Sequence, residues 1–189
     1  MRVVAGTYKG HRIETVPNKL TRPTTDKVKE ALFQMIGPFF DGGVFLDLFA
    51  GSGALGIEAI SRGMNQGVFV DQQAKAIQTI YSNIKKLNMD KQVEVYRTDA
   101  FRALKAAGKR GLVFDIIFLD PPYKKVSYEK LLKQINHFKL CNEKTIVVCE
   151  HDGREKLSDH IEAFNKIKSE TYGSGTSITL YQLGDESCE

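Results

Sequence analysis

Short apolar runs alternate with longer amphipathic stretches along most of this chain, and this alternation limits the folds open to it. Strands that are continuously apolar are buried on both faces, as in a parallel sheet covered by helices. We therefore predict an α/β fold with a doubly wound, Rossmann-like and mostly parallel sheet. Strands are expected at 44–48, 67–71, 93–97, 114–119 and 145–149, and helices between them at 54–62, 73–87, 101–107 and 128–135.

The N-terminal part departs from this alternation. Residues 2–16 are predicted to form a small hairpin around a turn at 7–10. A helix should follow Pro23, with Thr24 or Thr25 as its N-cap. Helical spacing of its apolar residues predicts one buried stripe, formed by Val28, Ala31, Leu32, Met35 and Ile36.

The C-terminal part also differs from the central pattern. Strands predicted at 166–171 and 177–182 flank a glycine-containing turn, which favours an antiparallel hairpin at the sheet edge. A length of 189 residues suits one domain. Within it we expect an N-terminal extension at 1–40, a catalytic core at 41–183 and an acidic tail at 184–189.

The net charge of +4 is confined to the N-terminal fifth of the chain. The first 40 residues hold seven Lys/Arg and three Asp/Glu, which leaves 20 basic and 20 acidic residues in the remainder. A polyanionic partner would account for this distribution, because phosphate contacts provide affinity that does not depend on sequence. A solvated basic face with no partner explains the charge equally well.

The composition excludes several classes of protein. No apolar run approaches the roughly 20 residues of a membrane helix, and the N-terminus lacks the apolar core of a signal peptide. Cys141, Cys149 and Cys188 are too few and too irregularly spaced for a disulfide framework, so we predict a cytoplasmic protein. The histidines show no ligand spacing, and no metal site is expected.

Three predicted strands end in residues suited to an adenosine-containing cofactor. Glycines at 51, 53 and 56 follow the first strand and Asp47, and they would let backbone approach a ligand. Asp71 ends the second strand, where a carboxylate can bind ribose hydroxyls. Asp99 follows the third strand and is placed to meet the adenine. The same glycine spacing fits a dinucleotide fingerprint, so an NAD-binding protein stays open on these residues alone.

A fourth strand end provides a different kind of chemistry. The predicted strand at 114–119 leads directly into Asp120-Pro121-Pro122-Tyr123. Two prolines fix φ and remove two N–H donors, which makes a stiff loop with a carboxylate and free carbonyls. Asp120 and the Pro121 carbonyl could accept both hydrogens of an exocyclic base amine, and Tyr123 could stack on the base. The loop predicts an amino methyltransferase acting on a nucleic-acid base.

Taken together, these segments resemble class I S-adenosylmethionine-dependent methyltransferases. More closely, nearly the whole chain resembles the RsmD family, bacterial enzymes that methylate guanine N2 in 16S ribosomal RNA. Lys29 departs from the family pattern, which more usually has arginine there, so a bidentate phosphate or base contact would be weakened. The matching residues include Arg2–Gly6, Gly10, Arg12, Arg22–Thr24, Val28–Phe33, Asp47–Gly53, Leu55, Gly56, Glu58, Ala59, Phe114, Asp115, Asp120–Tyr123, Tyr172, Gly173 and Thr176.

The resemblance implies roles for individual residues. Asp120, Pro121, Pro122 and Tyr123 would hold the target base. The cofactor S-adenosylmethionine would contact Asp47, Phe49, Ala50, Gly51, Ser52, Gly53, Asp71, Asp99 and Ala100. The RNA contacts would come from Arg2, Lys9 and Arg12 in the basic hairpin, and from Arg22 and Thr24 at the border of the pocket.

The function implied is methyl transfer from S-adenosylmethionine to N2 of a guanine in 16S ribosomal RNA. The sequence leaves open whether the substrate is free RNA or an assembled small subunit, and it does not indicate an oligomeric state. Two alternatives stay open: a DNA adenine or cytosine amino methyltransferase, which shares the Asp-Pro-Pro-Tyr loop, and an NAD-dependent oxidoreductase. The oxidoreductase leaves that loop without a role.

Overall fold

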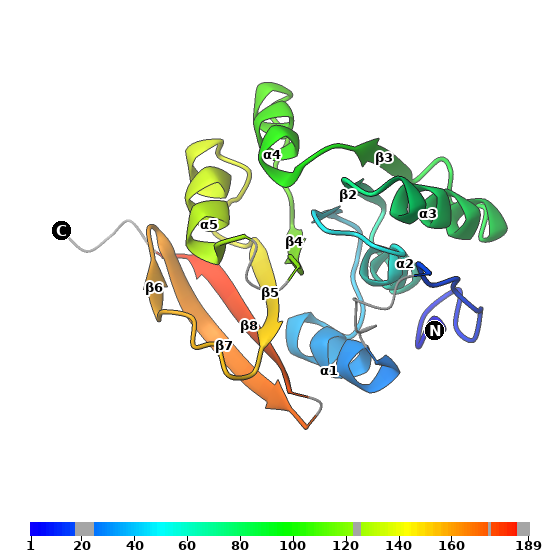
Figure 1. The fold of residues 1–189 in the computed structure, drawn as a ribbon, viewed down its shortest axis with the longest axis horizontal. Helices are drawn as coiled ribbons and strands as arrows, with labels where there is room; N and C mark the ends of the chain where they lie inside the picture. Colours follow the sequence, from blue (N-terminus) through cyan, green and yellow to red (C-terminus); the bar gives the residue numbers. More distant parts are fainter. Residues whose placement is uncertain (18–24, 123–125, 174, 185–189) are drawn as a thin grey trace. The chain divides into compact units, whose positions relative to one another are not determined.

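A computed structural model of the 189-residue chain describes residues 1–17, 25–122, 126–173 and 175–184. The chain divides into two compact units, Met1–Ala100 and Phe101–Glu189. Figure 1 gives the labels of the helices and strands. The expectation of one domain, with an extension before residue 41 and a catalytic core after it, stays a prediction.

The first unit contains three parallel strands, β1 (Val44–Asp47), β2 (Gln66–Asp71) and β3 (Val93–Arg97). β2 pairs with β1 on one side and with β3 on the other. Helices α2 (Ala54–Ser61) and α3 (Ala74–Lys86) connect successive strands, and both contact β2 (Figure 1). Parallel strands joined in this way bring their carboxyl ends to one edge of the sheet, where ligands of such folds bind.

The second unit combines one parallel strand pair with antiparallel strands. β4 pairs with β5 in parallel, and β5, β8, β7 and β6 then follow one another as antiparallel neighbours. The prediction of a mostly parallel α/β fold with an antiparallel C-terminal hairpin is thus confirmed. The elements are α4 (Ala100–Lys109), β4 (Ile116–Leu119), α5 (Tyr128–His137), β5 (Ile146–Asp152), β6 (His160–Ile161), β7 (Phe164–Tyr172) and β8 (Thr176–Leu183).

Three details of the sequence prediction were wrong. The two-residue strand β6 was missed, because so short a pairing leaves no apolar pattern. Strand β3 is partly exposed along its length, since it lies at the edge of its sheet and is not continuously buried. The helix expected at 73–87 also departs from a simple amphipathic pattern, because the aromatic Tyr81 is exposed whereas the polar residues Thr79 and Asn83 are buried.

The N-terminal hairpin is smaller than expected. The backbones of residues 1–3 and 11–13 pair through one antiparallel bridge, between Arg2 and Arg12. The Val3 N–H donates to the His11 carbonyl (2.9 Å) and the Ile13 N–H to the Met1 carbonyl (3.0 Å). The Gly10 N–H donates in addition to the Val3 carbonyl (2.9 Å), and the loop at residues 4–8 is held instead by contacts to α2.

Helix α1 (Asp26–Ile36) begins one residue after its N-cap Thr25, whose hydroxyl accepts from the Val28 N–H at 3.3 Å. Thr24, the other candidate cap, lies outside the described residues. The predicted stripe is partly right, because Val28, Leu32 and Ile36 are buried. Lys29 and Phe33 are buried as well, which the apolar pattern did not predict.

A buried ionic cluster holds the N-terminal part of the first unit together. The Glu58 carboxylate on α2 lies 3.2 Å from the Lys29 ammonium and 2.8 Å from Nε of Arg62. The side chains of Lys29 and Glu58 are fully buried, and that of Arg62 is 2% exposed. Burial lowers the pKa of Lys29, while the charge of Glu58 opposes that shift.

The Glu58 carboxylate also accepts two backbone hydrogen bonds from the N-terminal loop. The N–H groups of Val4 and Ala5 donate to its two oxygens at 2.9 and 3.0 Å. Lys29, which pairs with Glu58, donates in addition to the Arg2 carbonyl (2.5 Å). One carboxylate therefore joins the loop, α1 and α2.

We predict that Glu58→Ala destabilises the protein by about 3–5 kcal/mol, because it leaves two buried cations without their shared anion. Chemical denaturation followed by circular dichroism measures the free energy of unfolding. Glu30→Ala is the matched control, since Glu30 is exposed on α1 and its removal should change stability by less than about 0.5 kcal/mol. Equal stability losses in the two variants would contradict this role of Glu58.

Candidate active site

The carboxyl end of β1 leads into a glycine-rich loop that opens α2. Asp47 is buried at the strand end, and its carboxylate accepts from the Gly56 N–H at 3.3 Å. The N-cap of α2, Gly53, has no side chain to do this. Asp47 therefore satisfies one of the free N–H groups in the first turn of the helix, and its position in the loop is fixed by that contact.

Asp71 holds the other side of the same loop. From the end of β2, its Oδ2 accepts from the Gly51 N–H at 2.9 Å and its Oδ1 accepts from the Gln73 N–H at 2.8 Å. The Ala50 N–H donates in addition to the Val70 carbonyl at 2.9 Å. Each carboxylate oxygen has a second lone pair, so Asp71 can fix the loop and still accept hydrogen bonds from a ligand.

The three glycines of the loop have different reasons to be glycine. A Cβ on Gly56 would lie 2.3 Å from the Phe69 ring, so this glycine allows α2 to pack on the sheet. Gly53 has a φ of +80°, and a Cβ there would lie 3.3 Å from Phe69. Gly51 has a φ of +55° and faces open space within 4 Å. It is the position where a ligand can approach the backbone.

A residue that the sequence analysis missed fixes this loop from the helix side. The buried amide of Asn83 on α3 donates to the Ser52 carbonyl at 3.0 Å. The same amide nitrogen donates to the Glu14 carbonyl (3.0 Å), while its oxygen accepts from the Glu14 N–H (2.8 Å). A polar residue at a core position of an amphipathic helix was the signal that could have revealed it.

The end of β3 completes this group of strand ends. The Thr98 N–H donates to the Asp71 carbonyl at 3.1 Å, which places residues 98–100 beside the end of β2. Asp99 is half-buried and Ala100, the first residue of α4, is buried. The remaining loop residues of the predicted cofactor set, Phe49, Ala50 and Ser52, are half-buried or buried. The first unit thus brings the predicted cofactor residues to one sheet edge.

The Asp-Pro-Pro loop lies in the second unit, directly after β4. Asp120 is half-buried, Pro121 is buried and Pro122 is exposed. Tyr123, the predicted stacking residue, lies outside the described residues. Asp120 therefore directly follows a fully buried strand, and the next residue, Pro121, is buried as well.

A second acidic residue lies within the neighbouring strand, just beyond the level where β4 ends. Leu119 and Cys149 are opposite each other in the parallel pair of β4 and β5, and Glu150 follows Cys149 as a buried residue. The Tyr128 hydroxyl at the start of α5 donates to the Glu150 carbonyl oxygen. Burial raises the pKa of Tyr128, and the nearby acidic groups, Asp120 and Glu150 among them, add to this shift.

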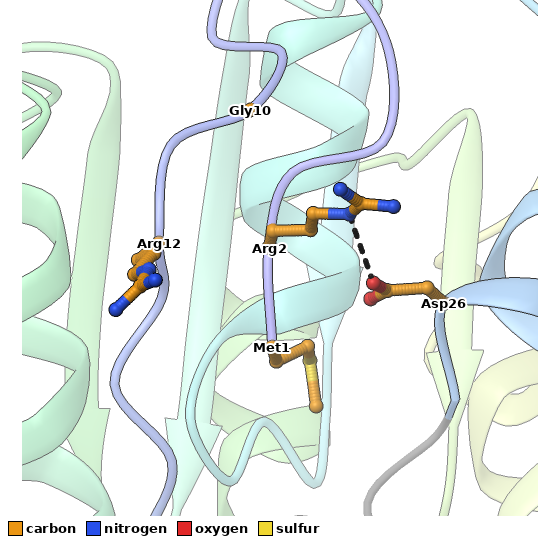
Figure 2. A pocket seen from close by; sticks show the side chains of 5 residues that line it. All are labelled: Met1, Arg2, Gly10, Arg12 and Asp26. Carbon is orange, nitrogen blue, oxygen red and sulfur yellow. Dashed lines mark hydrogen bonds and ion pairs between the residues drawn. The ribbon is translucent and has the colours of Figure 1, made fainter.

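A groove of about 540 Å³ lies against the N-terminal hairpin, with Met1, Arg2, Gly10, Arg12 and Asp26 along its walls. Figure 2 shows Arg2 and Arg12 on the two paired segments, with Asp26 beside Arg2. Arg2 Nε lies 3.2 Å from Asp26 Oδ2, and 68% of the Arg2 side chain is exposed. Two cationic side chains thus line one groove, and one of them is held by a carboxylate.

The other predicted RNA contacts are distributed differently. Lys9 is exposed near the turn of the hairpin, whereas Arg22 and Thr24 lie outside the described residues. Lys29 counted toward the basic N-terminal part of the sequence, but it is fully buried and paired with Glu58. A phosphate or base contact by Lys29, considered from its position in the family pattern, is excluded by this burial. The cationic surface is therefore smaller than the sequence suggested.

The described residues contain neither a membrane-spanning helix nor a metal-binding cluster. None of the helices within residues 1–17, 25–122, 126–173 and 175–184 is long and apolar enough to cross a membrane. In the same part of the chain, no group of three or more His, Cys, Asp or Glu residues could hold a metal ion. Cys141 and Cys149 are both free thiols.

Comparison with known proteins places this chain in a family. The family model described as conserved hypothetical protein 95 matches residues 1–182. A Bacillus subtilis protein named "Putative rRNA methyltransferase YlbH" is 50% identical over 182 residues, which cover 96% of this chain and 98% of that protein. The ribosomal RNA small subunit methyltransferase D of Buchnera aphidicola is 34% identical over 157 residues, covering 82% of this chain and 80% of that protein.

The fold is also found among solved structures. The structure titled "Putative methyltransferase yhhF from Escherichia coli" superimposes with a TM-score of 0.83 at 25% sequence identity. The superposition covers 98% of this chain and 99% of the Escherichia coli protein.

We predict that Asp71→Ala weakens binding of S-adenosylmethionine by about 1.5–3 kcal/mol, because the variant loses a charged acceptor and the hydrogen bond that fixes Gly51. Isothermal titration calorimetry measures the affinity. Asp90→Ala is the control, since Asp90 is an exposed aspartate of the same unit. Unchanged affinity in Asp71→Ala would remove Asp71 from the cofactor site.

Proposed function

The chain belongs to the RsmD family, and from this membership we propose that it methylates N2 of a guanine in small-subunit ribosomal RNA with S-adenosylmethionine as the methyl donor. The observation that carries the proposal is similarity over almost the whole chain to proteins named as ribosomal RNA methyltransferases. The Asp-Pro-Pro loop after β4 supports it, because its carboxylate suits an exocyclic amine.

The residues of the first unit fit the proposed cofactor. S-adenosylmethionine carries a ribose, an adenine and a charged methionine part. Asp71, at the end of β2, would accept hydrogen bonds from the ribose hydroxyls. The open side of Gly51 would let the methionine part approach the loop backbone, and Asp99 would accept from the adenine amine. When bound, the cofactor supplies an electrophilic methyl group on a sulfonium.

The second unit would hold the acceptor base. In the proposed transfer, the methyl group would pass from the sulfonium sulfur to guanine N2, with S-adenosylhomocysteine as the leaving group. One N2 hydrogen would be lost as a proton to solvent. Asp120 would accept a hydrogen bond from the amine, which directs the nitrogen lone pair and stabilises the positive charge that develops on it. The buried Pro121 would keep the carboxylate in place while the base is bound.

The target guanine is expected to be unpaired. Its N2 amine points into the shallow minor groove when paired, and a paired base cannot enter a closed pocket. Extrusion costs least for a nucleotide in a loop. The groove at the N-terminal hairpin would contact RNA phosphates, with Arg2 and Arg12 as the cations and Lys9 nearby. Arg22 and Thr24 are proposed, from the family resemblance, to border the pocket.

The two alternatives from the sequence are less well supported. A DNA amino methyltransferase shares the Asp-Pro-Pro loop, but relatives that match 96% and 82% of the chain are named for ribosomal RNA. An NAD-dependent oxidoreductase gives that loop no function. We also propose a cytoplasmic location, because small subunits are built in the cytoplasm. Free RNA and an assembled particle are both to be tested as substrates.

The first test supplies labelled S-adenosylmethionine and small subunits from a deletion strain, followed by digestion to nucleosides. The wild-type protein should place label in N2-methylguanine. Asp120→Ala should lose at least about 100-fold in turnover, because the amine loses its charged acceptor in the transition state, while affinity for the cofactor stays nearly unchanged. Label in N6-methyladenine or N4-methylcytosine alone would contradict the proposed substrate, and wild-type turnover in Asp120→Ala would contradict the mechanism.

A second prediction concerns the groove. Charge reversal of both Arg2 and Arg12 should weaken RNA binding and flatten its salt dependence, by about 0.7–0.9 in the log–log slope for each phosphate that the protein no longer neutralises. Fluorescence anisotropy at several salt concentrations measures this slope. Reversal of the exposed pair Lys85 and Lys86 at the end of α3 is the control with the same change of charge. The same slope in both double variants would place the RNA-binding surface elsewhere.

A further inference from the structure

The Glu150 carboxylate of β5 suggests how the base is chosen. Opposite residues in the pair of β4 and β5 are Ile117 and Val147, then Phe118 and Val148, then Leu119 and Cys149. Asp120 directly follows Leu119 after the end of β4, and Glu150 directly follows Cys149 within β5, so both come just after the last opposite pair. Neighbouring strands lie about 4.8 Å apart, and opposite residues of a parallel pair project from the same face of the sheet.

The backbone at Glu150 is fixed by β8 and α5. Glu150 directly follows Cys149, the last residue of β5 that lies opposite β4, and on the other edge it lies opposite Ile178 of β8. The Tyr128 hydroxyl donates to the Glu150 carbonyl oxygen. Only 6% of Glu150 is exposed, whereas Asp120 is half-buried. A fixed backbone and low exposure leave the Glu150 side chain few conformations.

The bases differ at the Watson–Crick atom beside the exocyclic amine. In guanine the ring nitrogen at that edge, N1, carries a hydrogen and is a donor. In adenine and cytosine the ring nitrogen next to the amine on the same edge has no hydrogen and is an acceptor. An ionised carboxylate only accepts hydrogen bonds. A second carboxylate beside the one that binds the amine therefore favours guanine and opposes the other two bases.

We propose that Glu150 selects guanine by accepting the N1–H hydrogen bond, while Asp120 accepts from the adjacent N2 amine. This inference rests on the proposed function and adds to it the residue that determines base specificity. Enzymes that read an extruded base do so through hydrogen bonds to its Watson–Crick edge. A carboxylate just after β4 and a second one in the neighbouring strand β5 would provide one acceptor for each of two adjacent donors on that edge.

The test compares guanine with 2-aminopurine at the methylated position of the RNA, once that position has been mapped. 2-Aminopurine keeps the 2-amine, but its N1 is an acceptor. The wild-type protein should prefer guanine in kcat/KM. In Glu150→Gln the side-chain amide can donate to N1 of 2-aminopurine, so the preference for guanine should fall by about 10- to 100-fold.

Glu143→Gln is the matched control, because Glu143 is exposed and lies before the start of β5. It should keep the wild-type preference. Titration of all three proteins with S-adenosylhomocysteine verifies that the cofactor site is intact, which separates a change of specificity from a loss of folding.

Two results would overturn the role of Glu150 alone: a wild-type preference retained in Glu150→Gln, or an equal loss of activity on both bases. Absence of N2-methylguanine with the wild-type protein would overturn the proposed function, and the role of Glu150 with it. The two failures are therefore distinguishable in the same set of assays.

Discussion

The Glu58 carboxylate is the interaction on which the first unit depends. It forms ion pairs with Lys29 and Arg62 inside the protein, and it accepts hydrogen bonds from the backbone N–H groups of Val4 and Ala5. Charges buried this deeply are tolerated only when they are paired and hydrogen-bonded. Since α2, which carries Glu58, begins at the glycine-rich loop, the same helix anchors the basic N-terminal segment and the proposed cofactor loop.

Carboxylates recur in this protein as acceptors for the backbone. Asp47 accepts from Gly56, and Asp71 accepts from Gly51 and Gln73. Each of these hydrogen bonds fixes, in the folded protein, a segment whose glycines give the backbone unusual freedom. The strand-end carboxylates therefore have a structural function before any ligand binds, and a cofactor would meet a loop that is already ordered.

The sequence predicted the strand and helix pattern well, because buried parallel strands and amphipathic helices have clear periodicities. Two omissions share one physical cause, which is that polar residues satisfied in the interior give no apolar signal. Lys29 pairs with Glu58, and Asn83 bonds to the Glu14 backbone, so both can be buried without appearing in the apolar pattern. The predicted site residues of the first unit were found at one sheet edge, whereas Arg22, Thr24 and Tyr123 lie outside the described residues.

The two proposed tasks, holding a methyl donor and choosing a base, place different demands on a carboxylate. At Asp71 the acceptor binds backbone N–H groups, which fixes the loop, and it has lone pairs left for a ligand. Asp120, just after β4, and Glu150, in the neighbouring strand β5, are proposed to provide two acceptors for adjacent donors on a base. A base without the second donor would leave one of these carboxylates facing a lone pair. Placing a carboxylate against a lone pair costs more free energy than the loss of one hydrogen bond. The register of β4 and β5, which sets the positions of the two carboxylates, would therefore contribute to base specificity.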